Sequence, residues 1–374
     1  MVTGSEHKRN EYLKLHYPGL WMAINHHRTH KNERIEFDGR HYLEEIYLAD
    51  TPDISIIKST QCGISEWLWL QTLGKALHGR SVFYVLPTII LKNQFVRDRI
   101  DRSILFTPYY RKLIKTGERA SESMSLKHIG TGGVAFVGSN SAASFTSYAA
   151  DDVIVDELDQ CDQRNLQMAP ERLSASSDPR TIRVSNPTIE GLGIDEAFSR
   201  TDRREWHIRH DCGEWVCLDF FRHVVEKQGE DYIVLDTSWE RDSGADPRPV
   251  CDKCGKPIDR FANGEWVPTG TGSRRGYHIS KLFSTNTTLT DLLERFEAGL
   301  VNDTAMQRFY NGDLGQAYTA EGAKISRIMI DQCTGDYRME DVAPGACVMG
   351  VDVGKLLHVR INEVLDDGRL RAVY

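Results

Sequence analysis

The stretch Asp-Asp-Val-Ile-Val-Asp-Glu-Leu-Asp-Gln at residues 151–160 predicts the fold class. Its β-branched run at residues 153–155 is typical of a strand buried on both faces of a parallel sheet. Asp156 and Glu157 follow directly. Because open α/β sheets gather their chemistry at the carboxyl ends of strands, Asp156 could hold Mg²⁺ and Glu157 could orient a water against a γ-phosphate. A capped strand that ends in two solvated acids is an equal alternative for this stretch alone.

A second strand precedes a loop suited to phosphate. Residues 54–57 (Ile-Ser-Ile-Ile) run into Lys-Ser-Thr-Gln-Cys-Gly-Ile-Ser at residues 58–65, and a helical apolar pattern follows. Strand, small polar turn and helix are the layout of a phosphate-binding loop. The standard pattern G-x-x-x-x-G-K-[ST] is not met, because Ile64 stands at its Lys position and Lys58 at its first Gly position. Lys58 could still fold back over the phosphates, and Ser65 stands where a hydroxyl would reach Mg²⁺. An ordinary strand–turn–helix remains the alternative.

Further strands are predicted at residues 82–87, 134–137 and 181–184, with helical segments between them. This alternation indicates an α/β fold with a parallel sheet and helices on both faces. The last of these strands ends in Ser-Asn-Pro-Thr at residues 185–188, where Pro187 stops the strand and Asn186 favours a turn. A polar residue at this strand end could sense the γ-phosphate and pass its presence on.

A composition shift after residue 205 indicates a metal-binding module. Cys251 and Cys254 form a C-x-x-C-G knuckle, and Cys212-Gly resembles half of a partner knuckle. Paired knuckles around a tetrahedral Zn²⁺ can stabilise a module that is too small for its own core. His210 and Cys217 are both candidates for the fourth ligand, with His210 slightly favoured. The alternative is a set of free cysteines.

Composition limits the remaining possibilities. The chain has 374 residues, 40% hydrophobic and 27% charged, and a formal net charge of −8. These values predict a soluble protein of two or three domains. No apolar run reaches the roughly 20 residues of a membrane span, and the N-terminus lacks an apolar signal core, so we expect a cytoplasmic protein without membrane contact. Any DNA contact must come from local basic clusters, each of which is also typical of a solvated face. The clusters are Arg97/Arg99/Arg102, Arg200/Arg203/Arg204 and Arg274/Arg275.

The C-terminal part resembles the beginning of another domain. Helical patterning at residues 276–330 is followed by a linker at 335–345 and by a buried-strand pattern at 347–354 that carries Asp352. Residues 358–365 and 369–374 read as two strands joined by an Asp-Gly turn. Since an isolated hairpin is marginal in water, we expect this domain to be incomplete at Tyr374.

The order of these motifs, more than any one of them, resembles the large subunit of tailed-phage terminases, and most closely the lambda-like branch. The resemblance covers nearly the whole chain from about residue 35. It implies a P-loop NTPase (RecA-like) sheet in an ATPase domain at residues 1–205, whose first 50 residues cover the nucleotide site. It further implies a zinc-ribbon-like module at 206–270, a helical lid and linker region at 271–345, and an incomplete RNase H-like nuclease domain at 346–374.

The resemblance also implies residue roles. Lys58 would be the phosphate-binding lysine, displaced to the start of the loop, and Ser65 the hydroxyl on the Mg²⁺ side. Asp156 would be the Mg²⁺ acid, Glu157 the catalytic carboxylate and Asp352 the first metal-binding acid of the nuclease. The nucleotide-binding residues would be Lys58, Ser59, Thr60, Gln61, Cys62, Gly63, Ile64, Ser65 and Asp156, together with Ser185, Asn186 and Thr188, which would couple hydrolysis to movement.

The implied function is ATP-driven packaging of double-stranded DNA into a procapsid in the host cytoplasm. The implied cofactors are ATP, Mg²⁺, a structural Zn²⁺, and Mg²⁺ or Mn²⁺ for the nuclease, which we expect to be inactive at this length. The implied partners are DNA, the terminase small subunit, the portal of the procapsid and further copies of the chain in a ring. An arginine finger would be Arg172 or come from a neighbouring copy.

Two other functions fit parts of the sequence. A helicase-like remodelling ATPase would need a second RecA-like half with its own arginine motif, and residues 206–374 do not resemble one. A non-catalytic, zinc-bearing DNA-binding or scaffold protein with a decayed phosphate loop would account for Ile64.

Overall fold

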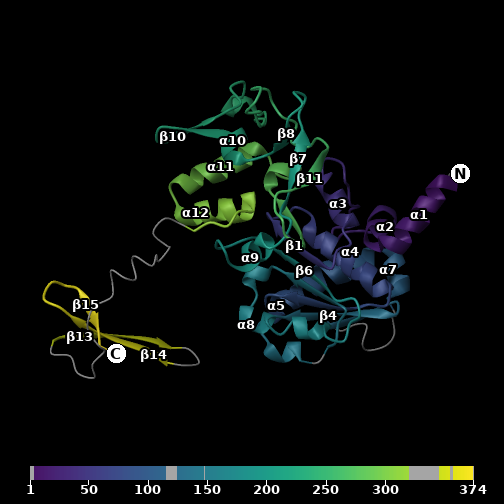
Figure 1. Cartoon of the computed structure of the whole chain (residues 1–374), viewed down its shortest axis with the longest axis horizontal. Coiled ribbons are helices and arrows are strands. Elements are labelled where there is room, and N and C mark those ends of the chain that lie inside the picture. Colours follow the sequence, from purple (N-terminus) through teal and green to yellow (C-terminus); the bar gives the residue numbers. More distant parts are fainter. Residues whose placement is uncertain (1–3, 115–123, 147, 320–344, 354–356, 374) are drawn as a thin grey trace. The chain divides into compact units, whose positions relative to one another are not determined.

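The computed structural model describes residues 4–114, 124–146, 148–319, 345–353 and 357–373 (Figure 1). It contains two compact units, Met1–Ala320 and Glu321–Tyr374. Of the helices in the described ranges, none combines the length and the apolar character needed to cross a bilayer.

The first unit is built on a ten-stranded sheet. Across the sheet the strands are β11 (Gly264–Pro268), β7 (Arg204–Arg209), β12 (Arg275–Ile279), β1 (Asp53–Lys58), β6 (Arg180–Ser185), β5 (Asp152–Asp156), β2 (Ser81–Leu86), β4 (Gly132–Gly138) and β3 (Leu126–Ile129), and β8 (Trp215–Cys217) pairs with β7. Neighbours from β7 to β4 run parallel. The predicted α/β class is confirmed. The sheet is mostly parallel, and β3, β8 and β11 pair antiparallel at its two ends.

The strands form because their β-branched and aromatic residues are buried on both faces of the sheet. Alternate side chains of β2 enter two separate apolar clusters: Val82 and Tyr84 belong to one, and Phe83 and Val85 to the other. The side chains of strand β5 alternate in the same way: Ile154 enters the first cluster, and the valines on either side of it enter the second. Two buried faces require cover on both sides, which the helices supply.

The helices of the first unit are α1 (Gly4–His16), α2 (Pro18–Asn25), α3 (Tyr42–Leu48), α4 (Ile64–Leu77), α5 (Ile89–Phe95), α6 (Arg102–Phe106), α7 (Pro108–Leu113), α8 (Gln163–Leu166), α9 (Gly193–Ser199), α10 (Phe220–His223), α11 (Leu289–Leu300) and α12 (Asp303–Arg308). Two π-helical turns interrupt them, η1 (Val96–Asp101) and η7 (Phe309–Leu314). Short 3-10 turns are η2 (Ala142–Phe145), η3 (Leu158–Gln160), η4 (Pro170–Leu173), η5 (Arg241–Ser243) and η6 (Lys281–Phe283).

The segment with the cysteine knuckles is inserted between strands of the main sheet. Its flanking strands β7 and β11 extend that sheet, while β9 (Val225–Gln228) and β10 (Asp231–Val234) form a separate hairpin. This hairpin and α10 lie beside α11 (Figure 1), where Phe220 and Tyr232 pack edge-on against Phe296 with ring centroids 5.3 and 4.9 Å away.

The sequence analysis missed strand β12, which falls inside the predicted helical region at residues 271–345. Its sequence, Arg-Gly-Tyr-His-Ile, has no β-branched run, yet it lies next to β1 at the centre of the sheet. Residues 320–344 of that predicted region lie outside the described residues.

The second unit contains a three-stranded antiparallel sheet of β13 (Cys347–Val353), β14 (Leu357–Val364) and β15 (Leu370–Ala372). The predicted Asp-Gly hairpin is present between β14 and β15. Its Gly368 has φ +80°, a value that favours glycine.

Candidate active site and metal cluster

The loop after β1 lies at the carboxyl edge of the sheet and is fixed by backbone hydrogen bonds. The Ser59 N–H donates to the Ile279 carbonyl at 2.8 Å, and the Thr60 N–H donates to the Gly312 carbonyl at 2.8 Å. Gly63 adopts φ +85° immediately before α4, which lets the chain turn from the loop into the helix. The sequence therefore folds locally as the strand–turn–helix of a phosphate loop.

Lys58 and Glu157 meet across the sheet edge. Lys58 ends β1 and Glu157 follows β5, and β6 lies between these strands. The Lys58 Nζ donates to Glu157 Oε1 at 2.6 Å. Glu157 adopts a left-handed conformation, φ 57°, which costs a non-glycine residue about 1–3 kcal/mol. Such strain at a residue that faces the phosphate loop is typical of a functional position.

Asp156 is buried beside this pair and is only partly satisfied. Its Oδ2 accepts a hydrogen bond from the Tyr84 hydroxyl at 3.0 Å. Within the described ranges, Asp156 Oδ1 and Glu157 Oε2 are buried without a hydrogen-bond partner. Buried, unpartnered carboxylate oxygens are the ligands that a hard cation such as Mg²⁺ prefers, so the residues present fit such an ion.

Burial and charge shift the acid–base properties of these groups. Burial raises the pKa of Asp156, although the nearby Lys58 ammonium opposes the shift. Burial acts to lower the pKa of Lys58, but Glu157 and Asp156 outweigh it and the net pKa is raised. Lys58 therefore stays charged, and the buried Asp156 carboxylate depends on a nearby cation for its ionised form.

A cavity of 280 Å³ is lined by Lys58 and Glu157, whereas Asp156 is not among the residues on its wall. The sequence-predicted residues on its wall are Lys58, Thr60, Gln61, Cys62, Gly63, Ile64, Ser65, Glu157 and Asn186, and Glu66 and Arg99 complete it. The sequence analysis missed the role of Arg99, which it counted only within a basic surface cluster. Arg172, the predicted finger, does not line this cavity and instead pairs with Glu171.

The segment after β6 connects the acid strand to η7. The Asp159 N–H donates to Ser185 Oγ at 3.2 Å, and the Thr188 hydroxyl donates to Asp159 Oδ2 at 2.8 Å. On the other side, Asn186 Nδ2 donates to the Asn311 carbonyl and Asn311 Nδ2 donates to the Thr188 carbonyl, both at 3.3 Å. A change at this strand end can therefore reach η7 through direct contacts.

His210, Cys212, Cys251 and Cys254 converge, with one ligand atom of each within 4.8 Å of the others. His210 Nε2 lies 3.3 Å from Cys254 Sγ, and Cys212 Sγ lies 3.9 Å from Cys251 Sγ. Tetrahedral Zn–S bonds of about 2.3 Å place two sulfurs about 3.8 Å apart, so the set fits a structural Zn²⁺. The structure does not bring the alternative ligand Cys217 into this set, because it lies back along β8.

Two family comparisons match most of the chain. The model described as "Phage terminase large subunit gpA, ATPase domain" matches residues 40–271. The model described as "Terminase large subunit gpA, endonuclease domain" matches residues 274–361. The chain belongs to the phage terminase large subunit gpA family. It is a subunit of a phage DNA-packaging motor with ATPase and endonuclease domains, as the order of its motifs predicted.

Solved structures resemble this terminase chain at low identity. The large terminase ATPase domain of Thermus phage P74-26 matches at 10% identity and a TM-score of 0.44, over 76% of this chain and 94% of that one. The large terminase of bacteriophage HK97 matches at 14% identity and a TM-score of 0.44, over 91% of this chain and 63% of that one. No curated protein matches the sequence.

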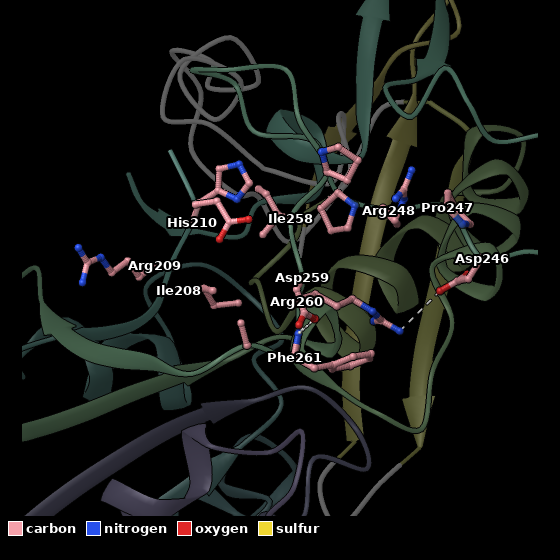
Figure 2. Close-up of a pocket in the computed structure, with 14 residues that line it drawn as sticks. Ile208, Arg209, His210, Asp246, Pro247, Arg248, Ile258, Asp259, Arg260 and Phe261 are labelled. Atoms are coloured by element: carbon pink, nitrogen blue, oxygen red, sulfur yellow. Dashed lines mark hydrogen bonds and ion pairs between the residues drawn. The ribbon is translucent and has the colours of Figure 1, made fainter. Parts of the chain in front are cut away.

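The terminase chain has a larger cavity beside the cysteine cluster, with a volume of 580 Å³ (Figure 2). His210 and Arg209 lie on one side of it and Arg260 and Asp246 on the other. The Arg260 guanidinium pairs with Asp246 at 3.7 Å and lies 4.4 Å from the centroid of the Phe261 ring. Glu157, which follows β5, and the phosphate loop line the 280 Å³ cavity and not this one, so the 280 Å³ cavity is the better candidate for ATP.

Asp352, the predicted nuclease acid, lies near the end of β13 in the second unit, opposite His358 on β14. It falls within the residues matched by the endonuclease-domain model.

Proposed function

We propose that the terminase chain hydrolyses ATP in the 280 Å³ cavity between the phosphate loop and the end of β5. The observation that carries this proposal is the Lys58–Glu157 pair, 2.6 Å apart, beside two buried carboxylate oxygens without partners. Lys58 binds the β- and γ-phosphates, and Ser65 and Asp156 hold the Mg²⁺ ion. When bound there, Mg²⁺ would neutralise charge on the phosphate oxygens.

Glu157 is the general base in this scheme. Without nucleotide, its Oε1 accepts a hydrogen bond from Lys58, so the carboxylate is neutralised and cannot activate water. An incoming triphosphate competes for the same ammonium. When Lys58 turns to the phosphates, the Glu157 carboxylate is free to accept a proton from the attacking water. In this scheme Glu157 activates water only when a triphosphate is bound.

Arg99 adds a further positive charge to the cavity wall. Its guanidinium already acts electrostatically on Asp156 and Tyr84 in the nucleotide-free chain. We assign it to stabilisation of charge on the γ-phosphate, while Ser59, Gln61, Cys62, Gly63 and Ile64 form the loop around the phosphates. An arginine from a neighbouring copy in a ring remains compatible with this role for Arg99.

The lid region is connected to the proposed ATP site through η7. The Gly312 carbonyl accepts from both the N–H and the hydroxyl of Thr60, at 2.8 and 3.2 Å. The adjacent Asn311 is hydrogen bonded to Asn186 and Thr188. Thus one dipeptide contacts both the phosphate loop and the segment after β6, and it is continuous with α12. A shift of either segment on hydrolysis would move α12.

Family membership supports the remaining parts of this proposal. The motor acts on double-stranded DNA in the host cytoplasm, as a ring of copies docked on the portal of a procapsid and directed by a small subunit. The cysteine cluster binds a structural Zn²⁺. Asp352 is the first Mg²⁺ or Mn²⁺ ligand of the nuclease.

Phosphate release and binding of a labelled ATP analogue test the site directly. Lys58→Ala should abolish both hydrolysis and tight binding, and the control Lys112→Ala, at an exposed position on α7, should change neither. Analogue binding that is unaffected by Lys58→Ala would refute the site and favour a non-catalytic scaffold.

A further inference from the structure

A second group of metal-ligating side chains lies on the β7–β8 hairpin, whose turn carries His210 and Cys212 of the first cluster. Glu205 and His207 belong to β7, and Cys217 belongs to β8. One possible ligand atom of each residue lies within 4.8 Å of the others. His207 is paired directly with Cys217 across the antiparallel ladder. Glu205, two residues before His207, projects from the same face of β7.

Hydrogen bonding within the chain does not account for this group. His207 Nε2 is buried and has no hydrogen-bond partner among the described residues. The Cys217 thiol lies within hydrogen-bonding reach of the Glu205 carboxylate, so those two side chains face each other. The His207 imidazole takes no part in that contact. Burying an imidazole nitrogen without a partner costs free energy, and a bound cation would recover it.

The group is separate from the His210 cluster. Two residue pairs of the ladder, Ile208 with Val216 and Arg209 with Trp215, lie between His207 and the hairpin turn that carries the first cluster. At about 3.4 Å per residue, this spacing separates the two groups by roughly 7–10 Å along the strands. One group therefore lies at the tip of the hairpin and the other at its base.

We propose that Glu205, His207 and Cys217 bind a second transition-metal ion, of which Zn²⁺ is the best match. A thiolate, an imidazole and a carboxylate are together the ligand types that Zn²⁺ accepts in proteins. Three protein ligands leave a fourth position for a water molecule. The assignment does not depend on the proposed ATP mechanism.

The second ion has a structural consequence for the sheet. Glu205 is paired with His278 on β12, and β12 is the parallel neighbour of β1, which ends in the phosphate loop. An ion at the base of the hairpin would hold β8 onto β7 next to this central part of the sheet. The inserted module would then be anchored by metal at both ends of one hairpin.

Metal analysis of the purified full chain tests the proposal. Elemental analysis should give two zinc ions per chain, and Cys217→Ser and His207→Ala should each give one. Cys254→Ser should also give one, from loss of the other site. The control Cys161→Ser removes a buried thiol outside both groups and should retain two.

Cobalt substitution distinguishes the two sites in the wild-type chain itself, so the test does not depend on how well a variant folds. In the wild-type chain, a first site with three thiolates and a second with one should give two separable Co²⁺ thiolate bands. Cys217→Ser should remove only the weaker band. A wild-type chain with one zinc that survives Cys217→Ser, or a chain with two zinc ions in both Cys217→Ser and His207→Ala, would overturn the proposal.

Discussion

Replacing Glu157 by Gln should make the chain bind ATP more tightly while it loses turnover. Without nucleotide, the Lys58 ammonium donates to Glu157 at 2.6 Å, and a triphosphate has to draw it away. A hydrogen bond to a charged partner is worth about 1.5–3 kcal/mol and one to a neutral partner about 0.5–1.5 kcal/mol. Because the Glu157 side chain is 27% exposed, we take the low end of the difference, about 1 kcal/mol. That difference lowers the Kd for ATP about fivefold.

Titration with a non-hydrolysable ATP analogue measures this Kd, and steady-state phosphate release measures turnover, which should fall at least about 100-fold. The matched control is Glu171→Gln, because Glu171 also contacts a cation, Arg172, but its side chain is 68% exposed and away from the cavity. The control should leave both quantities unchanged. Equal or weaker analogue binding by Glu157→Gln would refute the idea that Glu157 withholds Lys58 from the phosphates.

Three further changes have defined outcomes. Asp156→Asn should raise the melting temperature of the nucleotide-free chain at pH 7.5 by about 1–3 °C. Because burial raises the pKa of Asp156, ionisation of this carboxyl destabilises the folded wild-type chain as the pH rises through that pKa. The Asn variant cannot ionise there, so its gain in melting temperature should vanish in acid, where Asp156 is protonated. Asn311→Ala removes a bond of about 1 kcal/mol to Thr188 and should raise the ATP consumed per packaged base pair. Cys254→Ser should increase proteolysis within residues 210–260, because a metal-held module loosens without its ion.

For each of these three variants, a defined result would contradict the prediction. A pH-independent melting temperature difference for Asp156→Asn would show that its carboxylate is not destabilising in the folded chain. Unchanged ATP consumption per base pair in Asn311→Ala would show that η7 carries no signal. Proteolysis of Cys254→Ser equal to that of wild type, in the presence and absence of a chelator, would show that the cluster holds no structural ion.

The sequence predicted the central strands and the two strand-end motifs because these features are local. Residues 153–155 are β-branched and lead straight into their acids, and the loop at 58–65 lies between a strand and a helix. Strand β12 escaped prediction because Tyr277 and Ile279 are too few to mark a strand on their own, and β1 and β7 hold it in place. Its position depends on pairing partners far away in sequence, which periodicity does not report.

Side-chain positions depend even more on long-range contacts. Arg99 has no motif of its own, and only the packing of η1 beside the loop brings it to the cavity wall. The sequence favoured His210 only slightly over Cys217 as the fourth zinc ligand, because both lie a short distance from Cys212 along the chain. The β7–β8 ladder separates them, since Cys217 is paired with His207 while His210 lies in the turn.

The irregular phosphate loop has a simple physical basis. In the standard pattern, a lysine directly follows the loop glycine, but here that position holds Ile64, which is 1% exposed and belongs to the apolar cluster with Trp67 and Leu68. A lysine there would replace an apolar side chain that this cluster buries, which is unfavourable unless its ammonium finds a partner. Lys58, at the end of β1, instead has Glu157 and Asp156 to hold its charge before ATP arrives. The displaced lysine and the paired acids are therefore one arrangement, because the carboxylates that serve hydrolysis also allow the cation to be buried.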